Sequence, residues 1–464
     1  ALFRADVPVG PGAGGRRPRA RQPKALVLRD ARGRVIPCQE LSREAGEDLV
    51  EAPGHYPDFD RVEWRRVLFM ADDLPPLGVT QVSVEEGTAG PAPGSRLRVK
   101  ATDTSLTNEH IALRIESGGT IAVLDRKTGE SYHGLGALED DADVGDSYTP
   151  APRQLLAGEP DHVAVSVLHT GPLRGVLEVV RRYDAADLDV VTRVALDVGS
   201  RTIALELEDV NIRFDHRLRV AFPTGVRVPR VLADGAFGAV ERRAVVPRPR
   251  RGDTERATPT APMQRWVAAA RGRRGLVIVT DGLPQYEARP DGTLLVTLLR
   301  ATGALSKPDL PERPGHAGWP VPTIEGQCIG PFTARLAVQI THEGALATPE
   351  LFDQAADAFL VQPLAHMQRA FLRAPRRRPG PRLEGDGLVF SAMKPAESGR
   401  GLILRCYNAR GYGVRGAWYV PWPVKSAERC RLDERRVSAL NVARGGVIAF
   451  EVGPREIVTV LVRH

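Results

Sequence analysis

The stretch GVLEVVRRYDAADLDVVTRVALDVGSRTIALELEDV (residues 175–210) decides the fold class. It contains three runs, 175–184, 189–198 and 201–210, whose residues mostly alternate between apolar and polar or are β-branched. Such a period of two predicts strands with one buried face. Only short turn segments separate the runs, so we expect neighbouring strands to pair antiparallel.

The same pattern recurs along most of the chain. Further runs of this kind occupy residues 24–30, 66–75, 96–102, 111–117, 120–129, 162–170, 275–281, 293–300 and 332–340. Glycine-containing turn signals at 117–119, 127–130 and 290–293 separate some of them. The sequence therefore predicts a mainly β protein with large antiparallel sheets stacked as a sandwich.

One segment breaks the β pattern and suggests how the chain is divided. In residues 348–372, Thr348-Pro349-Glu350 reads as a helix start and apolar residues follow at helical spacing. Four more strand-like runs come after an Arg/Pro-rich linker. We therefore expect a small β module over 1–100, a large β-sandwich over 101–345, and a short helical link with a terminal β module over 346–464.

Composition excludes several classes of protein. Of the 464 residues, 42% are hydrophobic and 26% charged, and no apolar run is long enough to span a bilayer. The net charge of +7 comes almost wholly from arginine, in Pro/Gly-rich tracts without interleaved aromatics, so we expect no nucleic-acid or membrane partner. The first residues, ALFRADVPVG, lack both an initial Met and a secretory signal, which suggests a chain that starts within a longer protein or was trimmed. The four cysteines are far apart, which favours a reducing, cytoplasmic location.

Self-sufficient catalytic motifs are absent from the sequence. It contains no G-x-S-x-G nucleophile elbow, no P-loop and no Rossmann glycine fingerprint before a helix. The ten histidines are isolated, and although His216 follows Asp215, adjacent strand residues point to opposite faces and chelate one ion poorly. We expect the histidines to be structural or exposed.

An acidic cluster is the most unusual feature of this basic chain. The stretch GLGALEDDADVGDSYTPAP (134–152) places five carboxylates between positions 139 and 146. Like charges this close need compensation, which a metal, sugar hydroxyls, arginines or solvent could supply. The spacing does not fit an EF-hand. A pair of glycosidase carboxylates and a solvated loop both remain open.

Motifs in residues 106–152 point to a family. They comprise a strand start at Asn108-Glu109, turns at Gly119-Thr120 and Thr128-Gly129-Glu130, and the loop from Glu139 to Tyr148. Later segments agree in order, among them DHRLRVAFPTG (215–225), RPGHAGWPVPTIEGQCIG (313–330) and SAMKPAESGRGLILRCYNARG (391–411). Over nearly its whole length the chain resembles the carboxyl-terminal half of glycoside hydrolase family 38, the α-mannosidases.

The resemblance implies a galactose-mutarotase-like supersandwich, flanked by smaller β modules, that packs against a catalytic domain and shapes its sugar site. In the family, hydrolysis of α-mannosidic bonds depends on an amino-terminal zinc-bearing domain, whose signatures have no counterpart in this sequence. We therefore expect no catalytic residue, metal ligand or cofactor in this chain. The zinc is expected in a catalytic domain, present in cis or as a separate chain, so enzyme status is left open.

The resemblance also gives candidate site residues. We expect Asp143, Asp146 and Tyr148 to line or support the mouth of a mannose-binding site, because carboxylates accept hydrogen bonds from vicinal hydroxyls. Arg217 or Arg219 could balance the charge. The alternative is that the loop only seals the contact between domains.

A second hypothesis is a stand-alone carbohydrate-binding β-sandwich protein without catalysis. It would need an exposed aromatic platform, for which Trp64, Trp266, Trp319, Trp418 and Trp422 are the candidates. Trp418-Tyr419 and Trp422 cluster best, although we expect them to pack in a core. Under both hypotheses the partner is a mannose-containing carbohydrate, and a homo-oligomer is compatible with large sandwich surfaces.

Overall fold

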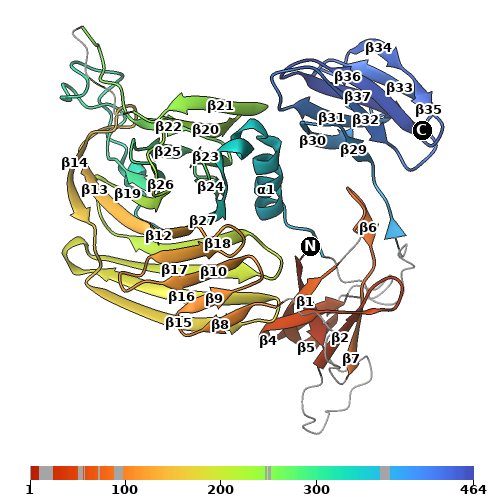
Figure 1. Cartoon of the computed structure of the whole chain (residues 1–464), viewed down its shortest axis with the longest axis horizontal. Coiled ribbons are helices and arrows are strands. Elements are labelled where there is room, and N and C mark those ends of the chain that lie inside the picture. Colours follow the sequence, from red (N-terminus) through yellow and green to blue (C-terminus); the bar gives the residue numbers. More distant parts are fainter. Residues whose placement is uncertain are drawn as a thin grey trace.

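The computed structural model describes residues 2–9, 25–50, 56, 58–71, 74–87, 98–245, 248, 252–365 and 377–464. All strand pairs among these residues are antiparallel, and α1 (Glu350–Leu360) is the α-helix that they contain. Three short 3-10 turns complete the helical content: Asp184–Ala186, Ile324–Gln327 and Glu343–Ala347. The expected mainly β, antiparallel fold class is confirmed (Figure 1).

Three sheets form the body that we call the large sandwich. One has nine strands, in the order β15 (His162–Thr170), β16 (Arg174–Tyr183), β17 (Leu188–Asp197), β18 (Thr202–Asn211), β27 (Gly330–Ile340), β24 (Arg274–Thr280), β23 (Trp266–Arg271), β20 (Arg230–Gly235) and β21 (Gly238–Arg243). One has six, in the order β14 (Pro152–Ala157), β13 (Ala137–Asp143), β19 (His216–Pro223), β26 (Thr293–Ala301), β25 (Gln285–Ala288) and β22 (Thr260–Pro262). The third has five, in the order β12 (Ser131–Leu135), β11 (Ile121–Asp125), β10 (Ile111–Ile115), β9 (Ser105–Thr107) and β8 (Lys100–Thr102).

The core of the large sandwich lies between the nine-stranded sheet and the other two. Leu177 and Val194 of the nine-stranded sheet share one buried cluster with Val123 of the five-stranded sheet and Val220 and Val296 of the six-stranded sheet. The runs at 175–210 that predicted strands are β16, β17 and β18, and their alternate residues supply much of this cluster. The turn predicted at 117–119 is also present: the N–H of Gly119 donates to the carbonyl of Glu116, and Gly119 has a φ of 74°.

Two further groups of sheets flank the large sandwich (Figure 1). The first group contains β1 (Leu2–Val9), β5 (Asp58–Met70) and β4 (Cys38–Val50) in one sheet, and β3 (Val35–Ile36), β2 (Ala25–Arg29) and β7 (Ser83–Gly87) in another. The second, which we call the terminal sandwich, stacks β29 (Arg382–Glu384), β32 (Val414–Tyr419), β36 (Val447–Val452) and β35 (Val442–Ala443) on β30 (Leu388–Pro395), β31 (Leu402–Asn408), β37 (Ile457–Arg463), β33 (Ser426–Cys430) and β34 (Arg436–Leu440). A short pair, β6 (Val79–Thr80) with β28 (Arg377–Arg378), connects the two groups. The domain boundaries near 100 and 345 stay a prediction.

The helix is shorter than its apolar spacing predicts. It starts where expected, with the N–H groups of Leu351 and Phe352 bonded to Thr348 and Pro349, but it ends at Leu360. Pro363 explains the end, because proline disfavours helical backbone in the preceding residue and lacks an N–H donor. The predicted continuation over 366–372 lies outside the described residues.

Candidate functional site

Four carboxylates of the acidic cluster lie on β13 and the fifth, Asp146, lies in the loop that follows, and arginines surround them. Arg219 on the neighbouring strand β19 donates to both Glu139 (3.0 Å) and Asp141 (2.6 Å). Arg289 holds both oxygens of Glu139 at 2.8 Å. Arginines therefore provide the charge compensation, and the predicted role of Arg219 is confirmed.

Asp140 and Arg217 also belong to this network of carboxylates and arginines. Asp140, which is fully buried, accepts from Arg213 and from Nδ1 of His216 at 2.8 Å. His216 is also buried and its other ring nitrogen lies 2.9 Å from Asn211, so this histidine is structural, as expected. Arg217 reaches Asp141 only at 3.5 Å, and burial together with the neighbouring Arg219 charge lowers the pKa of Arg217.

Asp143 closes the strand and organises the loop that follows. One carboxylate oxygen accepts from Nε of Arg300 at 2.8 Å, and the other accepts from the N–H groups of Gly145 and Ala151 at 2.9 Å. Burial alone would raise the pKa of Asp143, but the Arg300 charge and these bonds hold it below the usual value of 3.8. Asp143 has no solvent-exposed surface.

Asp146 ties the same loop to a distant segment. Its oxygens accept from Arg313 at 2.7 Å and from the N–H groups of Lys307, Tyr148 and Thr149 at 2.7, 3.0 and 2.8 Å. Burial would raise the pKa of Asp146, yet Arg313 and the backbone donors lower it. Both carboxylates are buried and bonded to protein donors that belong to the loop or contact it, and their role at a sugar site stays a prediction.

Tyr148 differs from the two aspartates because it points outward. Its side chain is 54% exposed, and a Cβ built on Gly318 would lie 3.2 Å from the Tyr148 hydroxyl, so the ring lies against this glycine. The next residue, Trp319, is 81% exposed. His316, Gly318, Trp319 and Pro320 line a shallow, open pocket of about 370 Å³. Tyr148 lies against Gly318 and Trp319 lines the pocket, and we call these two exposed side chains the aromatic pair.

The Asp146–Arg313 pair and a buried serine hold this aromatic pair in place. Besides Asp146, Arg313 donates to Thr149 at 2.8 Å and to the carbonyl of Lys307 at 2.9 Å. Ser306 accepts from the N–H of Gly318 at 3.3 Å. The loop that carries Tyr148 and the segment that carries Trp319 are therefore fixed to each other.

Trp319 is the site residue that sequence reasoning did not single out. It was one of five candidate tryptophans, but Trp418 with its neighbours formed the better sequence cluster. Trp418 and Trp266 are fully buried, so core packing is confirmed for Trp418. The signal for Trp319 was its place in the Gly/Pro-rich run HAGWPVP (316–322), which is typical of a surface loop.

Metal chemistry finds no support from the described side chains. Within the ranges that the structure describes, no group of three or more His, Cys, Asp or Glu residues is placed to hold a metal ion. The described residues therefore do not fit zinc. In the same ranges, no helix is long and apolar enough to cross a membrane.

The ion-paired loop predicts a specific pH dependence of stability. The folded pKa values of Asp143 and Asp146 lie below the unfolded value of 3.8, so the folded state binds fewer protons between these values. Their contribution to stability is complete above about pH 3.8 and is lost as the pH falls through the folded pKa values. The test is the midpoint of urea unfolding, measured from about pH 2.5 to 5. As the pH is lowered, this midpoint should fall more steeply for the unaltered chain than for an Asp143→Asn/Asp146→Asn variant. Equal slopes would contradict this assignment.

Comparisons with known proteins agree on one family. Residues 106–310 match the family model described as glycosyl hydrolases family 38 C-terminal domain, and residues 387–460 match the glycosyl hydrolases family 38 C-terminal beta sandwich domain. Together the two matches cover more than half of the chain. A protein of Halalkalibacterium halodurans named "Putative mannosylglycerate hydrolase" is 26% identical over 393 residues, which are 76% of this chain and 41% of that protein.

Two solved structures from Enterococcus faecalis share the fold. An alpha-mannosidase superposes with a TM-score of 0.79 at 18% identity, over 100% of this chain and 54% of its own. A protein in glycosyl hydrolase family 38 superposes with a TM-score of 0.78 at 19% identity, over 96% and 53%. The chain thus spans about half the length of these two proteins, and less than half the length of the curated relative. The chain belongs to glycoside hydrolase family 38, and its sheets are those of the carboxyl-terminal region of that family.

Proposed function

We propose that this chain forms part of an α-mannosidase-type glycosidase, in which it packs against a catalytic domain and supplies one wall of the sugar site. The single observation that carries this proposal is that Tyr148 and Trp319 are both exposed, on two segments that the buried Asp146–Arg313 ion pair helps to fix beside a shallow pocket. Zinc and the groups that cleave the glycosidic bond would come from the catalytic domain, on the same polypeptide or on a second chain.

An aromatic pair of this kind suits a carbohydrate. A pyranose presents an apolar C–H face that packs on a ring and hydroxyls that bond to polar groups, and tyrosine offers both a ring and a hydroxyl. Because Asp146, Arg313 and Ser306 fix the two segments, little conformational entropy would be lost when a sugar binds. In this proposal Asp143 and Asp146 support the sugar wall and Tyr148 lines it.

The surface around the aromatic pair supports a contact with a catalytic domain. It includes a group of exposed apolar side chains that we call the apolar face: Val144, Ile212, Phe214, Val321, Ile324 and Ile329. Hydrogen bonds hold the segments of these residues together. The N–H of Asp143 donates to the carbonyl of Asp215 (2.7 Å), and the N–H of Ser147 donates to the carbonyl of Ala304 (3.1 Å). The side-chain amide of Asn211 donates to the carbonyl of Gln327 (2.9 Å). Large exposed apolar side chains on neighbouring segments are a feature of protein interfaces.

Substitution of the aromatic pair tests the sugar contact. In the polypeptide that includes the catalytic domain, Trp319→Ala and Tyr148→Phe should each lower kcat/KM for an aryl α-mannoside roughly threefold to tenfold, because each removes one contact with the sugar. Circular dichroism should show an unchanged fold, because both side chains are exposed. Tyr412→Ala is the matched control, since Tyr412 is 53% exposed but lies in the terminal sandwich beside Asp386.

Two results would count against the proposal. An unchanged kcat/KM in both variants would remove the aromatic pair from the sugar site. Calorimetric titration of the present chain with methyl α-mannoside separates the alternative: binding that is as tight without a catalytic domain as with it would favour a stand-alone carbohydrate-binding sandwich.

A further inference from the structure

An arginine without a carboxylate partner lies inside the core of the large sandwich. On β16, alternate residues face the core, and Arg181 occupies such a position between Val179 and Tyr183. Only 1% of its side chain is exposed. It donates to the carbonyl of Gly136 at 2.6 Å and to the Thr192 hydroxyl at 3.0 Å, but its Nε has no hydrogen-bond partner.

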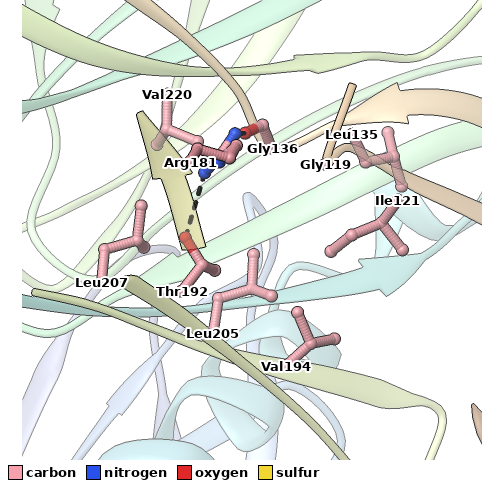
Figure 2. A pocket seen from close by; sticks show the side chains of 10 residues that line it. All are labelled: Gly119, Ile121, Leu135, Gly136, Arg181, Thr192, Val194, Leu205, Leu207 and Val220. Carbon is pink, nitrogen blue, oxygen red and sulfur yellow. Dashed lines mark hydrogen bonds between the residues drawn. The ribbon is translucent and has the colours of Figure 1, made fainter. Parts of the chain in front are cut away.

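Arg181 also lines a small cavity. The cavity has a volume of about 10 Å³. Figure 2 shows Arg181 with its two bonds, surrounded by the apolar side chains that line the cavity: Ile121, Leu135, Val194, Leu205, Leu207 and Val220. The stem of Arg181 passes over Gly119, where an added Cβ would lie 2.7 Å from Cδ of Arg181. Space at the turn is therefore kept for this arginine.

The charge of Arg181 is not balanced by its described neighbours. No aspartate or glutamate in the described ranges forms an ion pair with it, and the ionisable group beside it is the Tyr183 phenol, which also interacts with it as a hydrogen-bond partner. Burial raises the pKa of Tyr183, so the phenol is neutral at physiological pH. A buried charge requires both hydrogen-bond acceptors and an opposite charge. Gly136, Thr192 and Tyr183 provide acceptors but no negative charge.

We propose that this cavity is a binding site for one small monovalent anion of the halide class, held by Nε and the remaining N–H donors of Arg181. Such an ion supplies both the missing acceptor and the missing charge. Water would supply the acceptor alone. The small size of the cavity favours a single-atom anion over a tetrahedral oxyanion. The ion would link the two layers of the sandwich from within.

Bromide is the probe that locates the ion. In crystals of the unaltered chain grown in sodium bromide, anomalous scattering at the bromine edge should show a peak in the cavity, within about 3.5 Å of Nε of Arg181. Density without an anomalous signal would identify water and overturn the proposal. This readout needs no variant, so it decides even if Arg181 proves necessary for folding.

Thermal unfolding provides an independent test. Replacing sodium gluconate by sodium chloride at constant ionic strength should raise Tm saturably, by about 3 °C at ten times the Kd. Arg181→Met should abolish this halide dependence. Arg182→Met is the matched control, because Arg182 is the next residue and pairs with Asp189 on the surface, and it should keep the dependence. A halide effect that persists in Arg181→Met, or no effect in the unaltered chain, would overturn the proposal.

Discussion

Replacing Asp143 with alanine should lower the free energy of unfolding of the large sandwich by about 3–5 kcal/mol, which is the cost of removing one partner from a buried ion pair. Asp143 has no exposed surface, and the Arg300 side chain is 13% exposed. Without the carboxylate, the Arg300 charge and the N–H groups of Gly145 and Ala151 lose their acceptor. Each buried donor left unpaired carries its own desolvation cost.

Urea-induced unfolding measures this loss directly. Asp189→Ala is the control, because Asp189 pairs with Arg182 at a similar distance of 3.0 Å but both side chains are more than half exposed. Such a surface pair should contribute less than about 1 kcal/mol. The loss of unfolding free energy in Asp143→Asn should lie between those of Asp143→Ala and Asp189→Ala, because the amide oxygen can still accept hydrogen bonds from the backbone. If Asp143→Ala were as mild as Asp189→Ala, the buried pair would not be what holds the loop.

The same variant separates support from sugar contact. If Asp143 acts only by holding the loop, loss of the sugar contact in Asp143→Ala should accompany loosening of the loop, detected as faster proteolysis between residues 144 and 151. Trp319→Ala should weaken sugar binding without that loosening. The two roles that the sequence left open for the acidic loop therefore have different signatures.

The period-two pattern predicted the strands well because it depends on local residues. Strands β16, β17 and β18 lie where alternation placed them, and their apolar residues fill the core. The same alternation also puts Arg181 in the core, which an apolar pattern alone would not suggest. The helix end depended on Pro363, whose effect on the preceding backbone outweighed apolar residues at helical spacing.

Only part of the candidate site could be predicted from the sequence. The five clustered carboxylates and Tyr148 are local, so the sequence could show that they need compensation. Their partners are not local: Arg300 is 157 residues from Asp143, and Arg313 is 167 residues from Asp146. With about one residue in seven an arginine or lysine, spacing could not select these two. The loop of Gly318 and Trp319 lies against Tyr148 only because the fold brings the two segments together.

Replacing Asp353 with alanine should have the second large effect, a loss of about 2–4 kcal/mol at the contact between the large sandwich and the terminal sandwich. Asp353 lies on α1 and is 2% exposed. Its carboxylate accepts from Arg265 at 2.6 Å, from Nε1 of Trp266 at 3.0 Å and from the Tyr407 hydroxyl at 3.3 Å. Tyr407 belongs to β31, so this one carboxylate joins both sandwiches through the helix.

The pH dependence distinguishes Asp353 from Asp143. Burial raises the pKa of Asp353 above 3.8, despite the bonds from Trp266 and Arg265. The folded state therefore binds more protons than the unfolded state between these values. The proton-linked part of the contribution of Asp353 is complete below about pH 3.8 and is lost as the pH rises through the folded pKa. This sign is opposite to that of Asp143.

Asp353→Asn imitates the protonated side chain, and so it should cost less than Asp353→Ala at pH 7 and should remove the loss of stability on raising the pH above about 4. Asp357→Ala is the control, because Asp357 also bonds Arg265 (3.0 Å) but is 43% exposed and bonds no residue of the terminal sandwich in the described contacts. Urea unfolding followed at about pH 4 and 7 would show both effects. A cost of Asp353→Ala no larger than that of Asp357→Ala would mean that the helix docks by apolar packing of Phe352 and Ala356 on Trp266 rather than through this carboxylate.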